Sequence, residues 1–292
     1  MLNKEINSKK LDLNHVYNFK DPTPYYQSIT QYQYDLPERA KPYFQKVINA
    51  YRNDESVHSL KILDIGCSYG INAALLKFDK SLADLCQHYT DQLRLQQAEI
   101  ARIHSDYHWF HEANFDKELQ FIGLDSAKNA INYAVESQLI QSGIYTNLET
   151  SPLLKEDYRI MQDVNLLIST GCIGYITEVT FDKILSAVED ISKLWGAVFV
   201  LKMFDLSELQ KTLDQYNLVL VETGVTVKQR SFSSVNEKES MINFIEKQGL
   251  SAEKEKKSDN LFAQLFLILP PPLTNKPSIK KLINDLKNIN NQ

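Results

Sequence analysis

The chain has 292 residues, of which 43% are hydrophobic and 10% aromatic, so it is long and apolar enough to bury the core of one large domain or two small ones. Its formal net charge of -5 lacks the basic excess that contact with nucleic-acid phosphates uses, which argues against broad nucleic-acid binding. Three cysteines without paired spacing exclude a disulfide framework, and no stretch reaches the roughly 18 continuous apolar residues that span a bilayer, so we expect a cytoplasmic protein with free thiols and no membrane partner.

Residues 1–58 are predicted to form an N-terminal segment and a helix that pack on the main domain. The run 21–35, DPTPYYQSITQYQYD, is too aromatic for a simple linker and should pack on other structure. Asp35 is placed to cap a helix that begins near Pro37. Apolar residues then recur at intervals of three and four, which predicts one apolar helix face made of Ala40, Tyr43, Phe44, Val47, Ile48 and Tyr51.

The main domain, residues 59–272, is predicted to open with a strand over 61–65, glycine turns and a helix of strong helix formers, INAALLKF. An insertion over 80–119 follows, with the pattern of one or two amphipathic helices. We expect this insertion to serve as a lid, as a wall that faces the substrate, or as a purely structural pair of helices. Its inward-facing candidates are Leu82, Leu85, Leu93, Leu95 and Ile100.

Strands and helices alternate in the rest of the domain. A strand over 120–125 precedes a helix that Ser126 should cap, and a weaker extended piece covers 145–149. The later predicted elements are, in chain order, strand 163–170, helix 177–195, strand 197–204, helix 206–215, strand 218–232, helix 236–248, the apolar run 261–269 and a lysine-rich tail helix within 273–292. This alternation predicts an α/β fold with a parallel sheet covered on both faces, whose ligand sites lie at the carboxyl ends of the strands.

The loop Gly66-Cys67-Ser68-Tyr69-Gly70 fits both the G-x-S-x-G elbow of a hydrolase and a degenerate glycine-rich nucleotide turn. An α/β-hydrolase needs a histidine late in the chain, and no histidine follows His111, which argues against an esterase. A dinucleotide-binding turn wants glycine where Ser68 and Ile71 stand, which argues against an NAD(P) oxidoreductase.

The strand and loop LDIGCSYG, followed by GLDSAKNAINYA, resembles class I S-adenosylmethionine-dependent methyltransferases over about residues 60–270. The resemblance implies a seven-stranded, mostly parallel, doubly wound Rossmann-like sheet with a helical insertion after the first strand-helix unit. It also implies that the last run, LFAQLFLIL, inserts antiparallel beside AVFVLKMF. In dinucleotide-binding folds the acidic residue follows the glycine turn by about 20 residues. Asp125 follows its glycine turn at a greater distance in the sequence, and the insertion accounts for the additional residues.

The resemblance also implies a cofactor site for S-adenosylmethionine, with S-adenosylhomocysteine as product. Asp125 would accept hydrogen bonds from both ribose hydroxyls, and Gly66 and Gly70 would let the methionine part approach the backbone. The alternative for the two glycines is a simple tight turn, and the alternative for Asp64 is a buried carboxylate with a structural role. The cofactor-binding candidates are Asp64, Gly66, Cys67, Ser68, Gly70, Asp125, Ser126, Asn147, Leu148, Ser169 and Thr170.

The segment 169–175 is the predicted catalytic loop, because the family contacts both cofactor and acceptor after the fourth strand. Tyr175, or a histidine of the insertion, is the hypothesis for a general base or for positioning the acceptor. Tyr26, Tyr34 and Cys172 are candidates for binding the acceptor, with core packing as the alternative for all three.

We therefore predict a methyltransferase that acts on an O, N or S atom of a small molecule or a protein side chain. One alternative is an RNA 2'-O-methyltransferase, with Lys202 and Glu222 as tetrad candidates but Ser169-Thr170 where that tetrad needs aspartate. Others are a cofactor-binding module without transferase activity and a protein exported without a cleavable signal. His104, His108 and His111 share one helix face, yet we expect no metal, because further ligands are not evident. The oligomeric state is not predicted.

Overall fold

The structure is a computed structural model that describes residues 5–7, 16–112 and 114–289. Within these residues seven strands form one sheet in the order β3-β2-β1-β4-β5-β7-β6. β3, β2, β1, β4 and β5 are parallel, and β7 runs antiparallel to both β5 and β6. The predicted α/β fold and the antiparallel insertion of the last strand are therefore confirmed. The strands are β1 (Leu60–Ile65), β2 (Leu119–Leu124), β3 (Ser142–Ile144), β4 (Leu166–Thr170), β5 (Trp195–Leu201), β6 (Val219–Ser231) and β7 (Asn260–Leu269).

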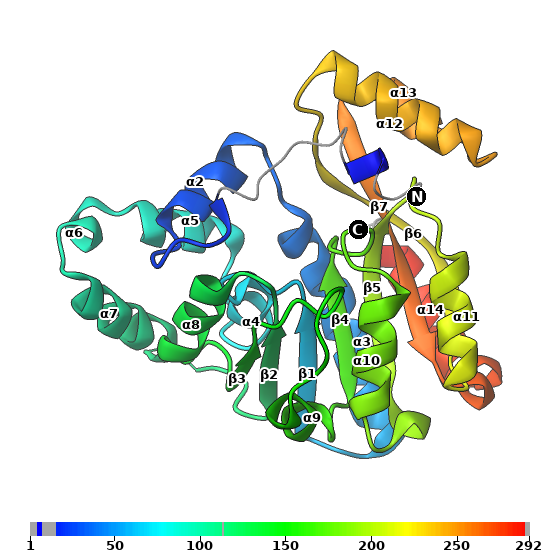
Figure 1. The fold of residues 1–292 in the computed structure, drawn as a ribbon, viewed down its shortest axis with the longest axis horizontal. Coiled ribbons are helices and arrows are strands. Elements are labelled where there is room, and N and C mark those ends of the chain that lie inside the picture. The colour runs from blue at the N-terminus through cyan, green and yellow to red at the C-terminus, as the bar shows by residue number, and fades with distance from the viewer. Residues whose placement is uncertain (1–4, 8–15, 113, 290–292) are drawn as a thin grey trace.

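Helices cover both faces of the sheet. Figure 1 shows α3 and α14 on one face of the sheet and α10 and α11 on the other, which explains why every residue of β4 and β5 is buried and why β5 is apolar throughout. The helices are α2 (Thr23–Gln31), α3 (Leu36–Glu55), α4 (Ile71–Leu76), α5 (Leu82–Thr90), α6 (Gln92–Leu95), α7 (Glu99–His111), α8 (Lys128–Glu136), α9 (Lys155–Met161), α10 (Glu178–Ala187), α11 (Ser207–Gln215), α12 (Val235–Lys247), α13 (Glu253–Lys257) and α14 (Pro277–Asn288), with short 3-10 turns η2 (Ile191–Lys193) and η3 (Pro271–Asn275).

The strand register brings several loops to one edge of the sheet. Asp64 of β1 is level with Gly123 of β2 and with Ile168 of β4. The parallel strands β1, β2 and β4 therefore end side by side, and the loops that follow them meet at the carboxyl edge.

The helix α3 has the predicted apolar face, since all six residues that periodicity selects are buried. Its predicted cap is wrong. Asp35 occupies the N-cap position, but its carboxylate caps no backbone N–H and instead pairs with Arg39, whose Nη2 lies 2.7 Å from Oδ2. The Asp35 side chain thus forms an ion pair with a residue one helical turn further along in place of the expected cap.

The predicted start of α8 and the predicted third strand are also wrong. Ser126 does not cap α8, because the helix begins at Lys128 and the Ala127 N–H donates instead to Asp125 Oδ1 at 2.9 Å. β3 lies earlier in the chain than 145–149, since residues 142–144 are the ones that pair with β2. The chain after β3 turns, and Asn147 Oδ1 accepts from the Glu149 N–H within that turn.

The helix predicted over 177–195 ends at Ala187. The remaining residues leave the helix because Trp195 pairs with Leu166 at the start of the parallel β4–β5 ladder. A turn, η2, connects the helix to that strand.

The insertion contains α5, α6 and α7, but part of its predicted inner face is wrong. Leu85 is buried, whereas Leu93 is 72% exposed and Ile100 is 84% exposed. Charged side chains, Arg94 and Asp106, occupy the interior instead. Since these two are paired with each other, they satisfy the condition under which charges are buried.

The tail helix α14 buries Ile279, Leu282 and Leu286 and contacts α3 and β6. Residues 290–292 of the predicted tail lie outside the described residues, as do 1–4 and 8–15 of the N-terminal segment. Among the helices of the described residues, none combines the length and apolar character needed to cross a membrane.

Candidate functional site

The turn after β1 has a backbone conformation that favours glycine. Gly66, Ser68 and Gly70 have φ angles of 77°, 49° and 78°, in the left-handed region that glycine adopts without strain. A Cβ on Gly66 would lie 2.6 Å from the Cβ of Cys172. The first glycine is therefore required both by the turn and by the close approach of the loop after β4.

Asp125 ties this turn to the end of β2. Its Oδ2 accepts from the Ser68 N–H at 2.9 Å, and its Oδ1 accepts from the Ala127 N–H at 2.9 Å. The side chain is half-buried, and burial raises the pKa of its carboxyl. Each carboxylate oxygen keeps a second lone pair, so the group can accept further hydrogen bonds.

Asp64 is fully buried at the end of β1, and one of its oxygens is unsatisfied. Oδ1 accepts from Asn72 Nδ2 at 2.9 Å, while Oδ2 has no hydrogen-bond partner among the described residues. Burial raises the pKa of this carboxyl to about 7, although the bond from Asn72 acts in the opposite direction. Ser68 Oγ is likewise buried without a partner in the described part of the chain. Two unsatisfied polar atoms therefore lie in and beside the glycine turn.

Asn72 is a further polar residue at this edge, and the sequence analysis did not single it out. It lies in the first turn of α4, and its Nδ2 also approaches Thr170 Oγ1 at 3.2 Å, so it connects the ends of β1 and β4. Its signal in the sequence is a single amide in the otherwise apolar helix INAALL. The helical periodicity does not explain a buried asparagine, and a polar partner does.

The loop after β4 packs directly against the end of β1. Cys172 Sγ lies 3.1 Å from the Ile65 carbonyl oxygen and 3.2 Å from Ser169 Oγ, and burial raises the pKa of its thiol to about 12. Tyr34 reaches the same loop, where its hydroxyl donates to the Thr170 carbonyl oxygen at 2.8 Å. Candidates from three separate parts of the sequence therefore meet at the carboxyl edge.

Other candidates lie apart from this cluster. Tyr26 is 1% exposed and stacks on Tyr89 with ring centroids 4.4 Å apart, so packing between α2 and α5 takes up its side chain. Leu148 is buried, and its carbonyl oxygen accepts from Lys183 Nζ. Asn147 lies in the turn after β3, and Ser126 is exposed.

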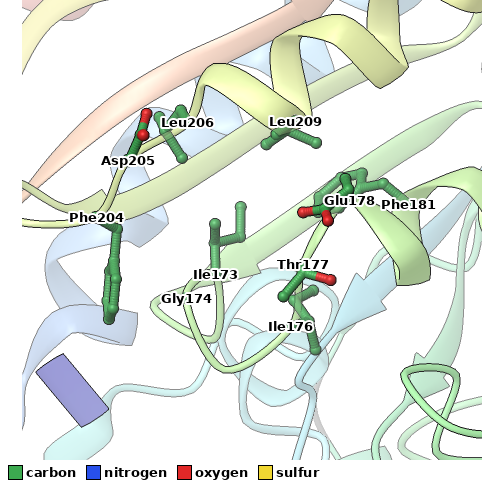
Figure 2. A pocket seen from close by; sticks show the side chains of 10 residues that line it. All are labelled: Ile173, Gly174, Ile176, Thr177, Glu178, Phe181, Phe204, Asp205, Leu206 and Leu209. Carbon is green, nitrogen blue, oxygen red and sulfur yellow. The ribbon is translucent and has the colours of Figure 1, made fainter. Parts of the chain in front are cut away.

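Tyr175 is exposed and lies on the loop that follows β4, and its two neighbours in the chain, Gly174 and Ile176, line a small pocket. The pocket has a volume of about 20 Å³, which suffices for one water molecule. Figure 2 shows it between the loop around Gly174 and the start of α11, with mostly apolar side chains around it. Its lining includes Ile173, Ile176, Phe181, Phe204, Leu206 and Leu209.

Lys202 and Glu222 do not share a site. Lys202 follows β5 at the carboxyl edge, and its Nζ donates to the Ser251 carbonyl oxygen. Glu222 lies on β6 opposite Phe266, which in turn is level with Val198 inside β5.

The three insertion histidines form no metal site. Among the described residues, no group of three or more His, Cys, Asp or Glu side chains lies close enough to hold a metal ion. His104 and His108 contact each other through Nε2 at 3.2 Å, and His111 Nδ1 lies 2.8 Å from the Tyr107 carbonyl oxygen.

No protein-family model and no curated protein sequence matches the chain. Solved methyltransferase structures do resemble it. The TehB-like SAM-dependent methyltransferase from Corynebacterium glutamicum is 12% identical, with 80% of this chain and 99% of that chain covered and a TM-score of 0.37. Magnesium protoporphyrin IX methyltransferase from Synechocystis, solved with bound SAM, is 9% identical, with 79% and 80% covered and a TM-score of 0.37. The plantazolicin methyltransferase BpumL, solved with SAH, is 13% identical, with 91% and 97% covered and a TM-score of 0.39.

Proposed function

We propose that the chain is a methyltransferase that uses S-adenosylmethionine. The observation that carries this proposal is Asp125, a carboxylate at the end of β2 that accepts the Ser68 N–H of the glycine turn after β1. A carboxylate fixed beside such a turn, at the carboxyl edge of a parallel sheet, suits a ligand with a ribose, because it accepts two hydroxyl donors at once.

The residues at this edge fit the rest of the cofactor. The unsatisfied Asp64 Oδ2 and Ser68 Oγ are polar acceptors suited to the amino group of the methionine part. The turn that holds Asn147 and Leu148 continues from β3, next to Asp125, whose N–H donates to the Ile144 carbonyl oxygen at 3.0 Å. That turn is our proposal for the adenine end. The full proposed set is Asp64, Gly66, Cys67, Ser68, Gly70, Asp125, Ser126, Asn147, Leu148, Ser169 and Thr170.

The cofactor supplies a methyl group that its sulfonium already activates. The task left to the chain is to hold the acceptor atom at attack distance and to exclude water. Tyr175, on the loop after β4, is our candidate for positioning the acceptor or removing its proton. Tyr34 and Cys172 are our candidates for binding the acceptor, since Tyr34 contacts the end of β4 and Cys172 belongs to the loop that follows. For Tyr175→Phe, a fall in kcat supports proton removal, whereas a rise in KM alone supports positioning.

We propose a small molecule or a protein side chain as the acceptor, methylated on O, N or S. The formal net charge of -5 favours these over nucleic acid. The separation of Lys202 from Glu222 along the strand register adds to the case against RNA 2'-O-methylation.

The direct test is transfer of a radiolabelled methyl group from S-adenosylmethionine into fractions of a cell lysate. The proposal predicts label that depends on the protein and is lost with Asp125→Ala. The label should persist with the control Asp163→Ala, because Asp163 lies just before the start of β4, at the opposite end of that strand. Label in large, protease-sensitive species indicates a protein acceptor, and label in small species a metabolite. Ribonuclease-sensitive label would support the RNA alternative. Cofactor binding without label in any fraction would indicate a binding module.

A further inference from the structure

Residues 16–22, here called the strap, contact both the glycine turn after β1 and the first turn of α8. The Phe19 N–H donates to the Tyr69 hydroxyl oxygen at 2.9 Å, and that hydroxyl donates to the Phe19 carbonyl oxygen at 2.9 Å. Tyr69 belongs to the glycine turn. The middle of the strap is thus fastened to the loop after β1.

The strap is also fastened to the start of α8. Asn18 Oδ1 accepts from the Asn129 N–H at 2.8 Å, and the Asn18 carbonyl oxygen accepts from Asn129 Nδ2 at 2.8 Å. The first N–H groups of a helix have no acceptor within the helix. The Asn18 side chain supplies an acceptor for one of them, the Asn129 N–H. The clasp formed by Phe19–Tyr69 and Asn18–Asn129 therefore links the glycine turn to the start of the helix that follows Asp125.

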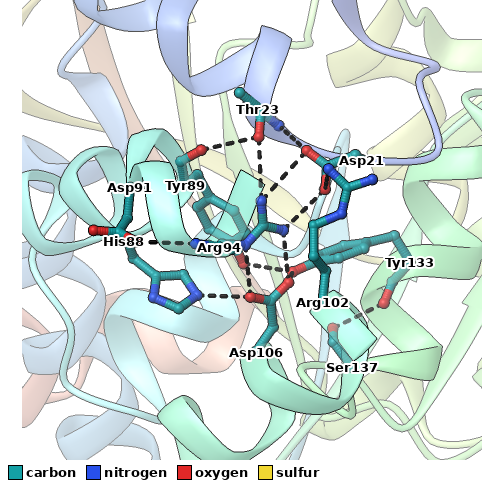
Figure 3. Close-up of polar contacts among 10 residues, drawn as sticks. All are labelled: Asp21, Thr23, His88, Tyr89, Asp91, Arg94, Arg102, Asp106, Tyr133 and Ser137. Carbon is teal, nitrogen blue, oxygen red and sulfur yellow. Dashed lines mark hydrogen bonds and ion pairs between the residues drawn. The ribbon is translucent and has the colours of Figure 1, made fainter. Parts of the chain in front are cut away.

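The insertion holds the far end of the strap. Arg94 Nη2 lies 3.0 Å from Asp21 Oδ2 and 2.8 Å from Asp106 Oδ2, and Asp106 is fully buried. Figure 3 shows these side chains with the Tyr133 hydroxyl, which donates to Asp106 Oδ2 at 2.8 Å. Because Tyr133 belongs to α8, the strap, the insertion and the helix after Asp125 share one buried polar network.

The start of the strap is buried, whereas its middle is exposed. Asn18, Phe19 and Lys20 are exposed, while Val16 is buried and Tyr17 is half-buried. The Tyr17 ring lies 5.4 Å from that of Tyr25. Burial raises the pKa of Tyr17, and the nearby charges of Tyr175 and Asp125 add to the shift. The Tyr25 ring lies in turn 5.4 Å from that of Tyr69, so Tyr17 is linked to the glycine turn through aromatic contacts.

We propose that the strap is the cover of the cofactor site, and that a nucleoside ligand enters and leaves when residues 17–19 detach from Tyr69 and Asn129. This inference rests on the proposed function for the identity of the ligand. The Asp21–Arg94 pair, with its buried partner Asp106, remains in place as the fixed end about which the strap turns. Weakening the clasp should therefore speed both association and dissociation of the ligand, since the closed form blocks both.

The test measures the rates of S-adenosylhomocysteine binding to the full chain by surface plasmon resonance. Asn18→Ala removes one clasp hydrogen bond and should raise both rate constants about fivefold. Asn284→Ala, an exposed asparagine of α14, is the control and should change neither. The double variant Asn18→Cys, Asn129→Cys should exchange the ligand at least about tenfold more slowly when oxidised, and a reductant should restore the rate.

Hydrogen exchange supplies a readout independent of binding. Strap amides should exchange faster in Asn18→Ala than in the wild type, and bound S-adenosylhomocysteine should slow them in both. Binding with equal rates in the wild type, in Asn18→Ala and in the oxidised double variant would overturn the strap proposal and leave the proposed function intact. Failure of the wild-type protein to bind S-adenosylhomocysteine would instead overturn the proposed function.

Discussion

Asp64→Asn should change how the stability of the protein depends on pH. The carboxyl of Asp64 is fully buried, and burial raises its pKa from 3.8 to about 7. Between these two values the folded protein holds a proton that the unfolded chain has released. Stability from this group is therefore highest in acid and falls as pH rises toward 7.

The size of the effect follows from the shift. One pKa unit corresponds to about 1.4 kcal/mol, so between pH 5 and pH 8 the wild-type protein loses about 2–3 kcal/mol of unfolding free energy through Asp64. Asparagine does not titrate, and its amide oxygen can still accept the Asn72 hydrogen bond. Any cost of burying the new amide group is the same at both pH values.

Urea unfolding of wild type and Asp64→Asn at pH 5 and pH 8, without cofactor, measures this term. The difference in unfolding free energy between the two proteins should shift by about 2–3 kcal/mol in favour of the variant from pH 5 to pH 8. A difference that is the same at both pH values would refute the assignment of a buried, proton-holding carboxyl to Asp64.

Two further substitutions test the packing around the site. Gly66→Ala and Gly249→Ala both place a side chain at positive φ, 77° and 75°, which costs about 1–2 kcal/mol. Only at position 66 does the new Cβ meet a neighbour, Cys172, so its unfolding free energy should fall by a further ~1–3 kcal/mol, and equal losses would speak against the close contact. Arg94→Met leaves Asp106 buried without its cation and should cost about 3–5 kcal/mol in urea unfolding. A cost below about 1 kcal/mol, the usual value of a surface pair, would contradict the buried network.

The fold was largely predictable because burial imposes regular patterns. The apolar face of α3, the apolar start of β4 and the apolar strand β5 are local consequences of where the core lies, so the sequence pattern reveals them. The interior of the insertion was not predictable, because Arg94 is buried through its contacts with Asp21 and Asp106. These partners lie 73 and 12 residues away from Arg94 in the sequence. Local hydrophobicity cannot indicate such a pair.

The sequence indicated that several candidate residues lie at the carboxyl edge of the sheet, but it did not indicate their contacts. Asp125 and Ser126 are adjacent potential caps, and a bond to Ser68, 57 positions earlier, decides which of them organises the loop. Tyr26 and Tyr34 come from one aromatic run, yet one stacks in the core and the other reaches Thr170. These outcomes depend on tertiary contacts that a single sequence does not display.

The most direct test of the central claim is calorimetric titration of the purified protein with S-adenosylhomocysteine, with wild type beside Asp125→Ala and the control Asp163→Ala. We expect micromolar binding by the wild type and the control. Loss of charge-assisted hydrogen bonds should weaken binding by Asp125→Ala at least about tenfold. Absence of binding by wild-type protein freed of co-purified ligand, or equal affinity in Asp125→Ala, would contradict a cofactor site built on Asp125.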